Sequence, residues 1–132
     1  MLLSNVMMGK RKKTFLIVDD SEFISNRLRN LLNDLKNSRK IYTAHTFTEV
    51  AGLLETDEAD IILLDIRLPD ANSLVLVSLL KELYPHVAII ILTNNFNKYY
   101  LKLYSKIGAG YFVDRLTVIA RIPEIAAFET YS

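Results

Sequence analysis

In this 132-residue chain, the side chains best placed to carry out chemistry are the carboxylates that directly follow apolar runs. Asp19 and Asp20 follow TFLIV (14–18), and Asp65 follows DIILL (60–64). An acid in that place lies where a buried strand reaches the surface. Carboxylates brought close together repel one another unless protons or a cation intervene. A hard cation with oxygen ligands, such as Mg²⁺, resolves this repulsion, so the three acids predict a divalent metal site.

Two further polar residues occupy the same kind of position. Thr93 follows VAIIIL (87–92), and Arg115 comes shortly after YFV (111–113). Ligands of open α/β sheets bind beyond the carboxyl ends of the strands. We therefore expect a hydroxyl, a cation and three acids to meet at one edge of a sheet.

The elements that must position these residues alternate between strand and helix. Apolar runs predict strands at 14–18, 40–44, 60–64, 87–92 and 111–113. Helical spacing predicts helices at 24–35, 48–54, 74–83 and 100–107, and a last helix with Pro123 in its first turn after an irregular or 3₁₀ stretch from Thr117. We expect Ser21 to begin the first helix and Thr48 to cap the second. The continuously apolar third and fourth strands are typical of a parallel sheet covered on both faces, which gives a three-layer α/β/α sandwich.

Composition limits the classes of protein that remain. The length fits one domain, and 51% hydrophobic with 23% charged residues is typical of a folded, soluble chain. With a net charge of +1, the chain has no overall positive charge that would indicate nucleic-acid binding. The lack of cysteine excludes metal sites with thiolate ligands. The apolar N-terminal stretch precedes its basic cluster, which is the reverse of a secretory signal, and is too short to span a membrane. We expect a flexible leader at 1–13, one domain at 14–132 and a cytoplasmic location.

Four segments together resemble the receiver domain of two-component response regulators. They are FLIVDDS, ILLDIRLPD, IILT and GAGYFVDR, in this order and at this spacing, and the resemblance runs from about residue 14 to the end. It implies a flavodoxin-like fold, a doubly wound five-stranded parallel sheet with strand order 2-1-3-4-5. It also implies Asp65 as the phosphoacceptor, which attacks the phosphorus of a phosphohistidine.

The resemblance implies a role for the other residues at the strand ends. Mg²⁺ would be held by Asp20, Asp65 and the backbone carbonyl of Arg67, with Asp19 acting largely through a bound water. Catalysis of phosphoryl transfer is mostly positioning and neutralisation of charge on oxygen, which these groups can supply.

Three more residues take roles from the resemblance, or depart from it. Thr93 would donate a hydrogen bond to a phosphoryl oxygen, and Phe112 falls at the aromatic switch position. Ser73 falls where a glycine commonly precedes the third helix, so it either alters that loop or caps the helix.

Arg115 falls where the family has a lysine that pairs with the phosphoryl group. A planar guanidinium is not interchangeable with an ammonium, and we expect its fork to bridge Asp65 and one other acid and to compete with Mg²⁺. The next residue is Leu116, at a position where the family usually has proline or, in some members, serine. A cis peptide before it would cost about 2.5–4 kcal/mol, so we expect trans.

The leading functional hypothesis is a stand-alone phosphoacceptor switch. Its phosphodonor would be a sensor histidine kinase or a phosphotransfer protein, with self-catalysed transfer and dephosphorylation rather than conventional enzyme turnover. Because the chain ends after the fifth helix, we expect output through protein contacts on the fourth helix, fifth strand and fifth helix, around Tyr99, Tyr104 and Phe112. Direct nucleic-acid or membrane binding is not expected, and a homodimer is left open.

The alternatives are weaker. The runner-up is a pseudo-receiver that is never phosphorylated, in which Arg115 merely neutralises the acids. A hydrolase with an aspartyl-phosphate would need a second acid where Arg67 stands, and a flavin phosphate would be repelled by Asp19 and Asp20. His45 and His86 lack a partner motif, so we expect turn or solvated histidines.

Overall fold

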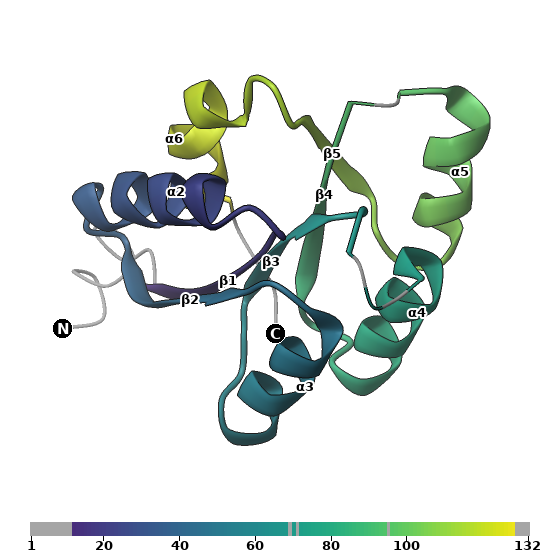
Figure 1. Cartoon of the computed structure of the whole chain (residues 1–132), viewed down its shortest axis with the longest axis horizontal. Helices are drawn as coiled ribbons and strands as arrows, with labels where there is room; N and C mark the ends of the chain where they lie inside the picture. The colour runs from purple at the N-terminus through teal and green to yellow at the C-terminus, as the bar shows by residue number, and fades with distance from the viewer. Residues whose placement is uncertain (1–11, 69, 71, 95, 129–132) are drawn as a thin grey trace, which may run out of the picture.

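The fold described here is that of a computed structural model, which describes residues 12–68, 70, 72–94 and 96–128 (Figure 1). The leader that we expected at 1–13 falls largely outside these ranges. Its last residue, Lys13, is the first residue of strand β1 and is buried.

Five parallel strands form one sheet in the order β2-β1-β3-β4-β5, as predicted. The strands are β1 (Lys13–Val18), β2 (Ser38–Ala44), β3 (Ile61–Asp65), β4 (Ala88–Thr93) and β5 (Tyr111–Asp114). In the register, Val18 lies beside Leu64, and Asp65 lies beside Leu92. The carboxyl ends of β1, β3 and β4 therefore meet at one edge.

Helices cover both faces of the sheet (Figure 1). They are α2 (Glu22–Asp34), α3 (Phe47–Thr56), α4 (Ser73–Leu83), α5 (Lys98–Lys106), the 3₁₀ helix η1 (Val118–Arg121) and α6 (Ile122–Ala126). Helices α2 and α6 contribute to one core cluster, and α3, α4 and α5 contribute to the other. Pro123 lies in the first turn of α6, directly after η1, which confirms the prediction for the last helix.

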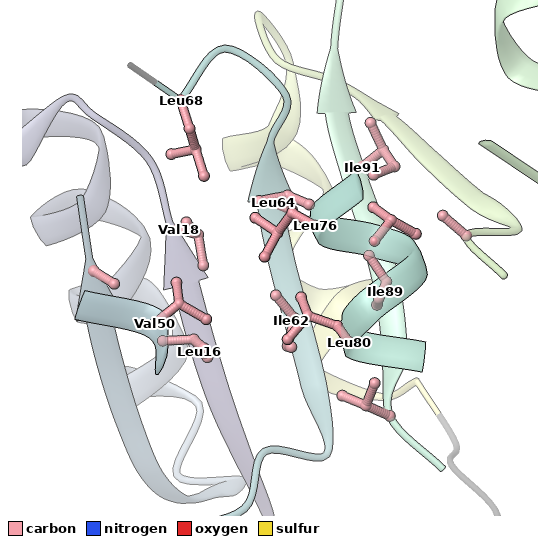
Figure 2. Packing of buried hydrophobic residues seen from close by; sticks show 14 of the residues in the cluster. Leu16, Val18, Val50, Ile62, Leu64, Leu68, Leu76, Leu80, Ile89 and Ile91 are labelled. Atoms are coloured by element: carbon pink, nitrogen blue, oxygen red, sulfur yellow. The ribbon is translucent and has the colours of Figure 1, made fainter. Parts of the chain in front are cut away.

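The core explains why the strands run continuously apolar. Alternate residues of each strand point to opposite faces. Leu16, Ile62 and Leu64 therefore join α4 residues such as Leu76 and Leu80 on one face (Figure 2). Their chain neighbours, among them Ile17 and Leu63, pack under α2 and α6 on the other. Each such side chain contributes about 1.5–3 kcal/mol by its burial, which holds the strand ends in a fixed frame.

The residue that caps the start of the helix is the expected one in α2, but a different one in α3 and α4. The Ser21 hydroxyl accepts a hydrogen bond from the Ile24 amide at 3.3 Å, as a helix cap. The cap predicted at Thr48 is wrong, because Thr46 accepts from Glu49 at 3.2 Å and the helix begins at Phe47. Ser73 does not cap α4 either, because Asn72 takes that place and accepts from the Leu74 and Val75 amides.

No helix among the described residues has both the length and the apolar character needed to cross a membrane.

Candidate functional site

Three carboxylates converge at the edge formed by the ends of β1 and β3. Oxygen atoms of Asp19, Asp20 and Asp65 all lie within 4.8 Å of one another. Asp19 and Asp65 are fully buried, whereas Asp20 is exposed. Because β1 and β3 are paired in the sheet with Val18 opposite Leu64, Asp19 and Asp65, which directly follow these two residues, become adjacent. The convergence predicted from the sequence is confirmed.

The buried Asp19 carboxylate is held by neighbours on several sides. Its Oδ1 accepts a hydrogen bond from the Ser21 amide at 2.8 Å. Burial, together with the charge of Asp65, raises the pKa of Asp19 above its ordinary value, against the opposing effects of Ser21 and Arg115. The cluster therefore retains uncompensated repulsion, which a bound cation would relieve.

Arg115 bridges two of the acids from the end of β5. Its Nη2 lies 3.0 and 3.3 Å from the two carboxylate oxygens of Asp19, and its Nε lies 3.3 Å from Asp65 Oδ2. Burial of the guanidinium opposes its charge, but the hydrogen bond to Asp19 and the charge of Asp65 raise the pKa of Arg115. The expected bridging is confirmed. The peptide before Leu116 is trans, since the described residues contain no cis peptide bond.

Arg67 lies near the other carboxylate oxygen of Asp65. Its backbone amide and its Nε lie 3.0 and 3.4 Å from Asp65 Oδ1, while its side chain remains 58% exposed. The phosphoacceptor predicted from the sequence thus has an arginine near each carboxylate oxygen. The backbone carbonyl of Arg67 stays a predicted metal ligand.

The donor set fits a hard divalent cation. Asp65 Oδ2 is buried and makes no hydrogen bond with the part of the chain that the structure describes, since Arg115 Nε is close to it but not aligned as a donor. A buried carboxylate oxygen with unused acceptor capacity suits a cation such as Mg²⁺, which prefers oxygen ligands. Asp19, Asp20 and Asp65 are the residues that could hold it.

Thr93 and Phe112 lie on β4 and β5, the two strands that follow β3 in the sheet. Thr93 is the last residue of β4 and is 3% exposed, and β4 adjoins β3. Phe112 lies on β5 beside Ile91 and packs, partly buried, against the core cluster on the α3–α5 face. Tyr99 is exposed as expected, but Tyr104 is only 4% exposed and does not belong to the surface.

The structure adds contacts that hold the loop between β3 and α4, whose described residues are 66–68, 70 and 72. Asp70 accepts hydrogen bonds from the Phe47 amide at 2.8 Å and from the Thr48 amide at 3.4 Å, and these bonds lower the pKa of Asp70. Ser73 donates a short hydrogen bond to the Ile66 carbonyl. The Asp70 contact left no signal in the sequence, because α3 lies more than twenty residues away along the chain.

His45 also contacts the site without entering the acid cluster. It follows β2, where a turn histidine was expected, and its Nδ1 lies 2.7 Å from the backbone carbonyl of Asp19. Nothing in the sequence marked this contact, because it depends on the pairing of β2 with β1.

Comparisons with known proteins agree on one family. The family model described as response regulator receiver domain matches residues 15–125. The sensory transduction protein LytR of Staphylococcus saprophyticus is 32% identical over 98 residues, which are 74% of this chain and 38% of that protein. This chain therefore spans well under half the length of that relative.

Solved structures share the fold at low sequence identity. The non-phosphorylated receiver domain of the stress response regulator RcsB from Escherichia coli has a TM-score of 0.81 at 19% identity, covering 89% of this chain and 92% of that one. The chemotaxis response regulator CheY4 of Vibrio cholerae has a TM-score of 0.71 at 20% identity, covering 84% and 98%. At these identities the likeness shows the flavodoxin-like fold alone.

Proposed function

This chain belongs to the response regulator receiver family of two-component signalling, and we propose that its Asp65 accepts a phosphoryl group from a phosphohistidine. The donor would be a sensor histidine kinase or a phosphotransfer protein. The observation that carries the proposal is the cluster of Asp19, Asp20 and Asp65, whose oxygens lie within 4.8 Å of one another beside Arg115.

The transfer step uses groups that already surround Asp65. One carboxylate oxygen attacks the phosphorus, the bond from phosphorus to the histidine nitrogen breaks, and the imidazole leaves with the electron pair. Negative charge spreads over the phosphoryl oxygens in the transition state. Arg115 and the Thr93 hydroxyl lie at the ends of β5 and β4, where they can bind two of these oxygens.

Mg²⁺ would be held by Asp20, Asp65 and the Arg67 carbonyl, with Asp19 acting through water, and would neutralise charge on the acids and the phosphoryl oxygens. Arg115 would bind a phosphoryl oxygen directly during the transfer. It must turn from Asp19 or Asp65 toward the incoming group, because its fork is engaged with both acids in the resting state.

The output would be a shift between two packings of one surface. When Thr93 moves toward the phosphoryl group, space opens into which Phe112 can turn from the β5 edge. The affected surface comprises α5, β5 and α6, and carries the exposed Tyr99. A phosphoryl group can shift this equilibrium only by its different interaction energy with the two packings.

We further propose that this domain signals in the cytoplasm through protein contacts, without binding nucleic acid or membrane itself. A homodimer is one form that such contacts could take. One similar structure, that of RcsB from Salmonella typhimurium, concerns DNA interaction, but this chain covers 64% of it.

Intact-mass spectrometry after incubation with acetyl phosphate tests the phosphoacceptor. We expect one phosphoryl adduct in the wild type with Mg²⁺, and none in Asp65→Asn or after chelation with EDTA. Asp34→Asn, an exposed acid at the end of α2, serves as the matched control and should label like the wild type. An adduct in Asp65→Asn or in EDTA would contradict the proposal.

A pseudo-receiver is the second candidate, and the two arginines favour it. Arg115 and Arg67 already pair with the buried acids, so the cluster is partly neutralised by the chain itself. This function predicts neither Mg²⁺ binding nor an adduct at Asp65. Calorimetric titration with Mg²⁺ therefore separates the two candidates.

A further inference from the structure

His45 holds the peptide group that joins Asp19 to Asp20. It lies in the turn between β2 and α3, and its Nδ1 is 2.7 Å from the backbone carbonyl of Asp19. A carbonyl oxygen can only accept a hydrogen bond, so Nδ1 carries a proton and donates it. The imidazole therefore makes a directed hydrogen bond to the backbone between two acids of the cluster.

This bond extends the pairing of β1 with β2 past the end of the two strands. The last pair in register is Val18 with Ala44, and the Asp19 amide donates to the Ala44 carbonyl at 3.1 Å. The chain then turns into α3, with Thr46 as the cap. The side chain of His45 thus supplies a donor where the strand has already ended. Both polar backbone groups of Asp19 are held by consecutive residues, Ala44 and His45.

The loop that carries His45 is itself fixed on its other side. Phe47 and Thr48, at the start of α3, donate their amides to the Asp70 carboxylate at 2.8 and 3.4 Å. Asp70 belongs to the loop between β3 and α4. The turn after β2 is therefore tied both to the turn after β1 and to the loop after β3. A donor in so constrained a segment can hold its acceptor in one place.

Asp20 is the acid that depends most on this support. Asp19 is fully buried, and its carboxylate accepts from the Ser21 amide and pairs with Arg115. Asp20 is exposed, so packing alone does not fix the direction of its carboxylate. Its backbone nitrogen belongs to the same planar peptide group as the Asp19 carbonyl. A hydrogen bond that fixes this group therefore limits where the Asp20 side chain can lie.

We propose that His45 is a positioning residue for the metal site, which acts through the Asp19 carbonyl to hold Asp20 in place for the cation. The proposal rests on the proposed function, in which Asp20 is a ligand of Mg²⁺. Removal of a group that orients a metal ligand typically lowers metal affinity by about 10- to 100-fold. A histidine that only fills space in the turn would have no such effect.

The first measurement is made without metal, by NMR of the histidine ring nitrogens. A hydrogen bond made by one ring nitrogen sets which nitrogen of a neutral imidazole carries the proton. At mildly alkaline pH we therefore expect His45 in the tautomer with the proton on Nδ1. His86, the other histidine of the chain, is exposed and serves as the internal reference, with the tautomer mixture of a solvated ring. A His45 ring protonated on Nε2, or with the same mixture as His86, overturns the proposal.

Two substitutions separate the donor from the rest of the ring. His45→Leu removes the donor, whereas His45→Asn keeps an N–H at the equivalent place in the side chain. Relaxation of the Asp20 amide nitrogen reports how rigidly its peptide group is held. We expect an order parameter of about 0.85, the value of rigid backbone, in the wild type and in His45→Asn, and a lower one in His45→Leu. Thermal melting verifies the fold of each variant. An equal order parameter in the wild type and His45→Leu, or a loss that His45→Asn does not restore, contradicts positioning by this hydrogen bond.

The last measurement is Mg²⁺ affinity by calorimetric titration. We expect His45→Leu to bind about tenfold more weakly than the wild type, and His45→Asn to recover most of that loss. His86→Leu is the matched control and should bind like the wild type, because His86 precedes β4 at the opposite edge of the sheet. Equal affinity in the wild type and His45→Leu overturns the proposal. If the wild type binds no Mg²⁺, the proposed function fails instead, and the tautomer and the Asp20 order parameter still decide whether His45 positions that residue.

Discussion

Arg115 and Asp19, which are 96 residues apart in the sequence, form a hydrogen-bonded ion pair across the site, with Nη2 3.0 Å from Oδ1. The same guanidinium also lies 3.3 Å from Asp65 Oδ2. One cation from the chain therefore faces two of the acids that would hold the metal. Charge-assisted hydrogen bonds of this kind are among the stronger ones, so the resting cluster is partly closed by Arg115.

The first prediction is that Arg115→Lys binds Mg²⁺ more tightly than the wild type. A lysine makes a point contact and cannot bridge both carboxylates, so Asp19 or Asp65 is released for the metal. We expect a gain on the order of tenfold, or about 1.4 kcal/mol, with faster labelling by acetyl phosphate. Calorimetric titration measures the affinity, and circular dichroism verifies the fold.

Arg121→Lys is the control for this prediction, because Arg121 pairs with Glu124 on the surface. It should leave Mg²⁺ affinity and labelling unchanged. Equal Mg²⁺ affinity in the wild type and in Arg115→Lys would show that the bridge does not compete with the metal.

The second prediction concerns the pH dependence of stability that arises from Asp19. Its pKa is raised in the folded protein above the ordinary value of 3.8, so the folded state binds the proton more readily than the unfolded state. Without metal, this residue makes the protein less stable as pH rises from the ordinary value through the folded pKa. Asp19→Asn should therefore increase the free energy of unfolding near neutral pH and remove this part of the pH dependence.

Urea denaturation across the acid-to-neutral range measures the second prediction, with Asp34→Asn as the exposed control. Adding Mg²⁺ should narrow the difference between the wild type and Asp19→Asn, because the cation supplies the missing countercharge. A less stable Asp19→Asn at neutral pH would mean that the bond to Arg115 outweighs burial and repulsion.

The third prediction is that Asp70→Ala loosens the start of α3. Asp70 accepts hydrogen bonds from the Phe47 and Thr48 amides, and these amides have no partner within a helix at that position. Amide exchange at Phe47 and Thr48 should accelerate several-fold, while exchange in α2 stays the same. Because the pKa of Asp70 is lowered, its contribution to stability is present above the ordinary value and is lost as pH falls through the folded pKa.

Hydrogen–deuterium exchange followed by NMR checks the third prediction. Asp57→Ala is the comparison, since Asp57 caps the opposite end of α3 and pairs with Arg39 and Lys40. Similar acceleration in both variants would place the effect in the helix as a whole rather than in the Asp70 contact.

The fourth prediction concerns the switch through Thr93. Beryllofluoride with Mg²⁺ should shift amide resonances on α5, β5 and α6, around Tyr99 and Phe112. Thr93→Ala should keep beryllofluoride binding but abolish most of the Phe112 shift, because the hydroxyl that moves toward the phosphoryl group is gone. Two-dimensional NMR of both proteins decides this. A full Phe112 response in Thr93→Ala would exclude the hydroxyl as the link.

The sequence by itself determined the alternation of elements, the parallel sheet and the residues at the strand ends. Apolar runs that end in Asp19, Asp65 and Thr93 require buried strands with polar termini, and parallel packing places those termini at one edge. The bridging by Arg115 was also predictable, because a guanidinium placed among three acids has more than one carboxylate within reach. Each of these conclusions depends only on the order of apolar and polar residues along the chain and on the charge of the side chains.

Only the tertiary structure decided which loops hold the site in place. Thr48 resembles a helix cap in the sequence, yet α3 begins earlier, with Thr46 as its cap and Asp70 from a distant loop binding the Phe47 amide. Tyr104 was expected on the output surface with Tyr99, yet it is buried in the core cluster to which α3, α4 and α5 contribute. Hydrogen bonds between segments far apart in the chain depend on how the helices pack on the sheet. Their partners therefore become identifiable only once the fold has brought them together.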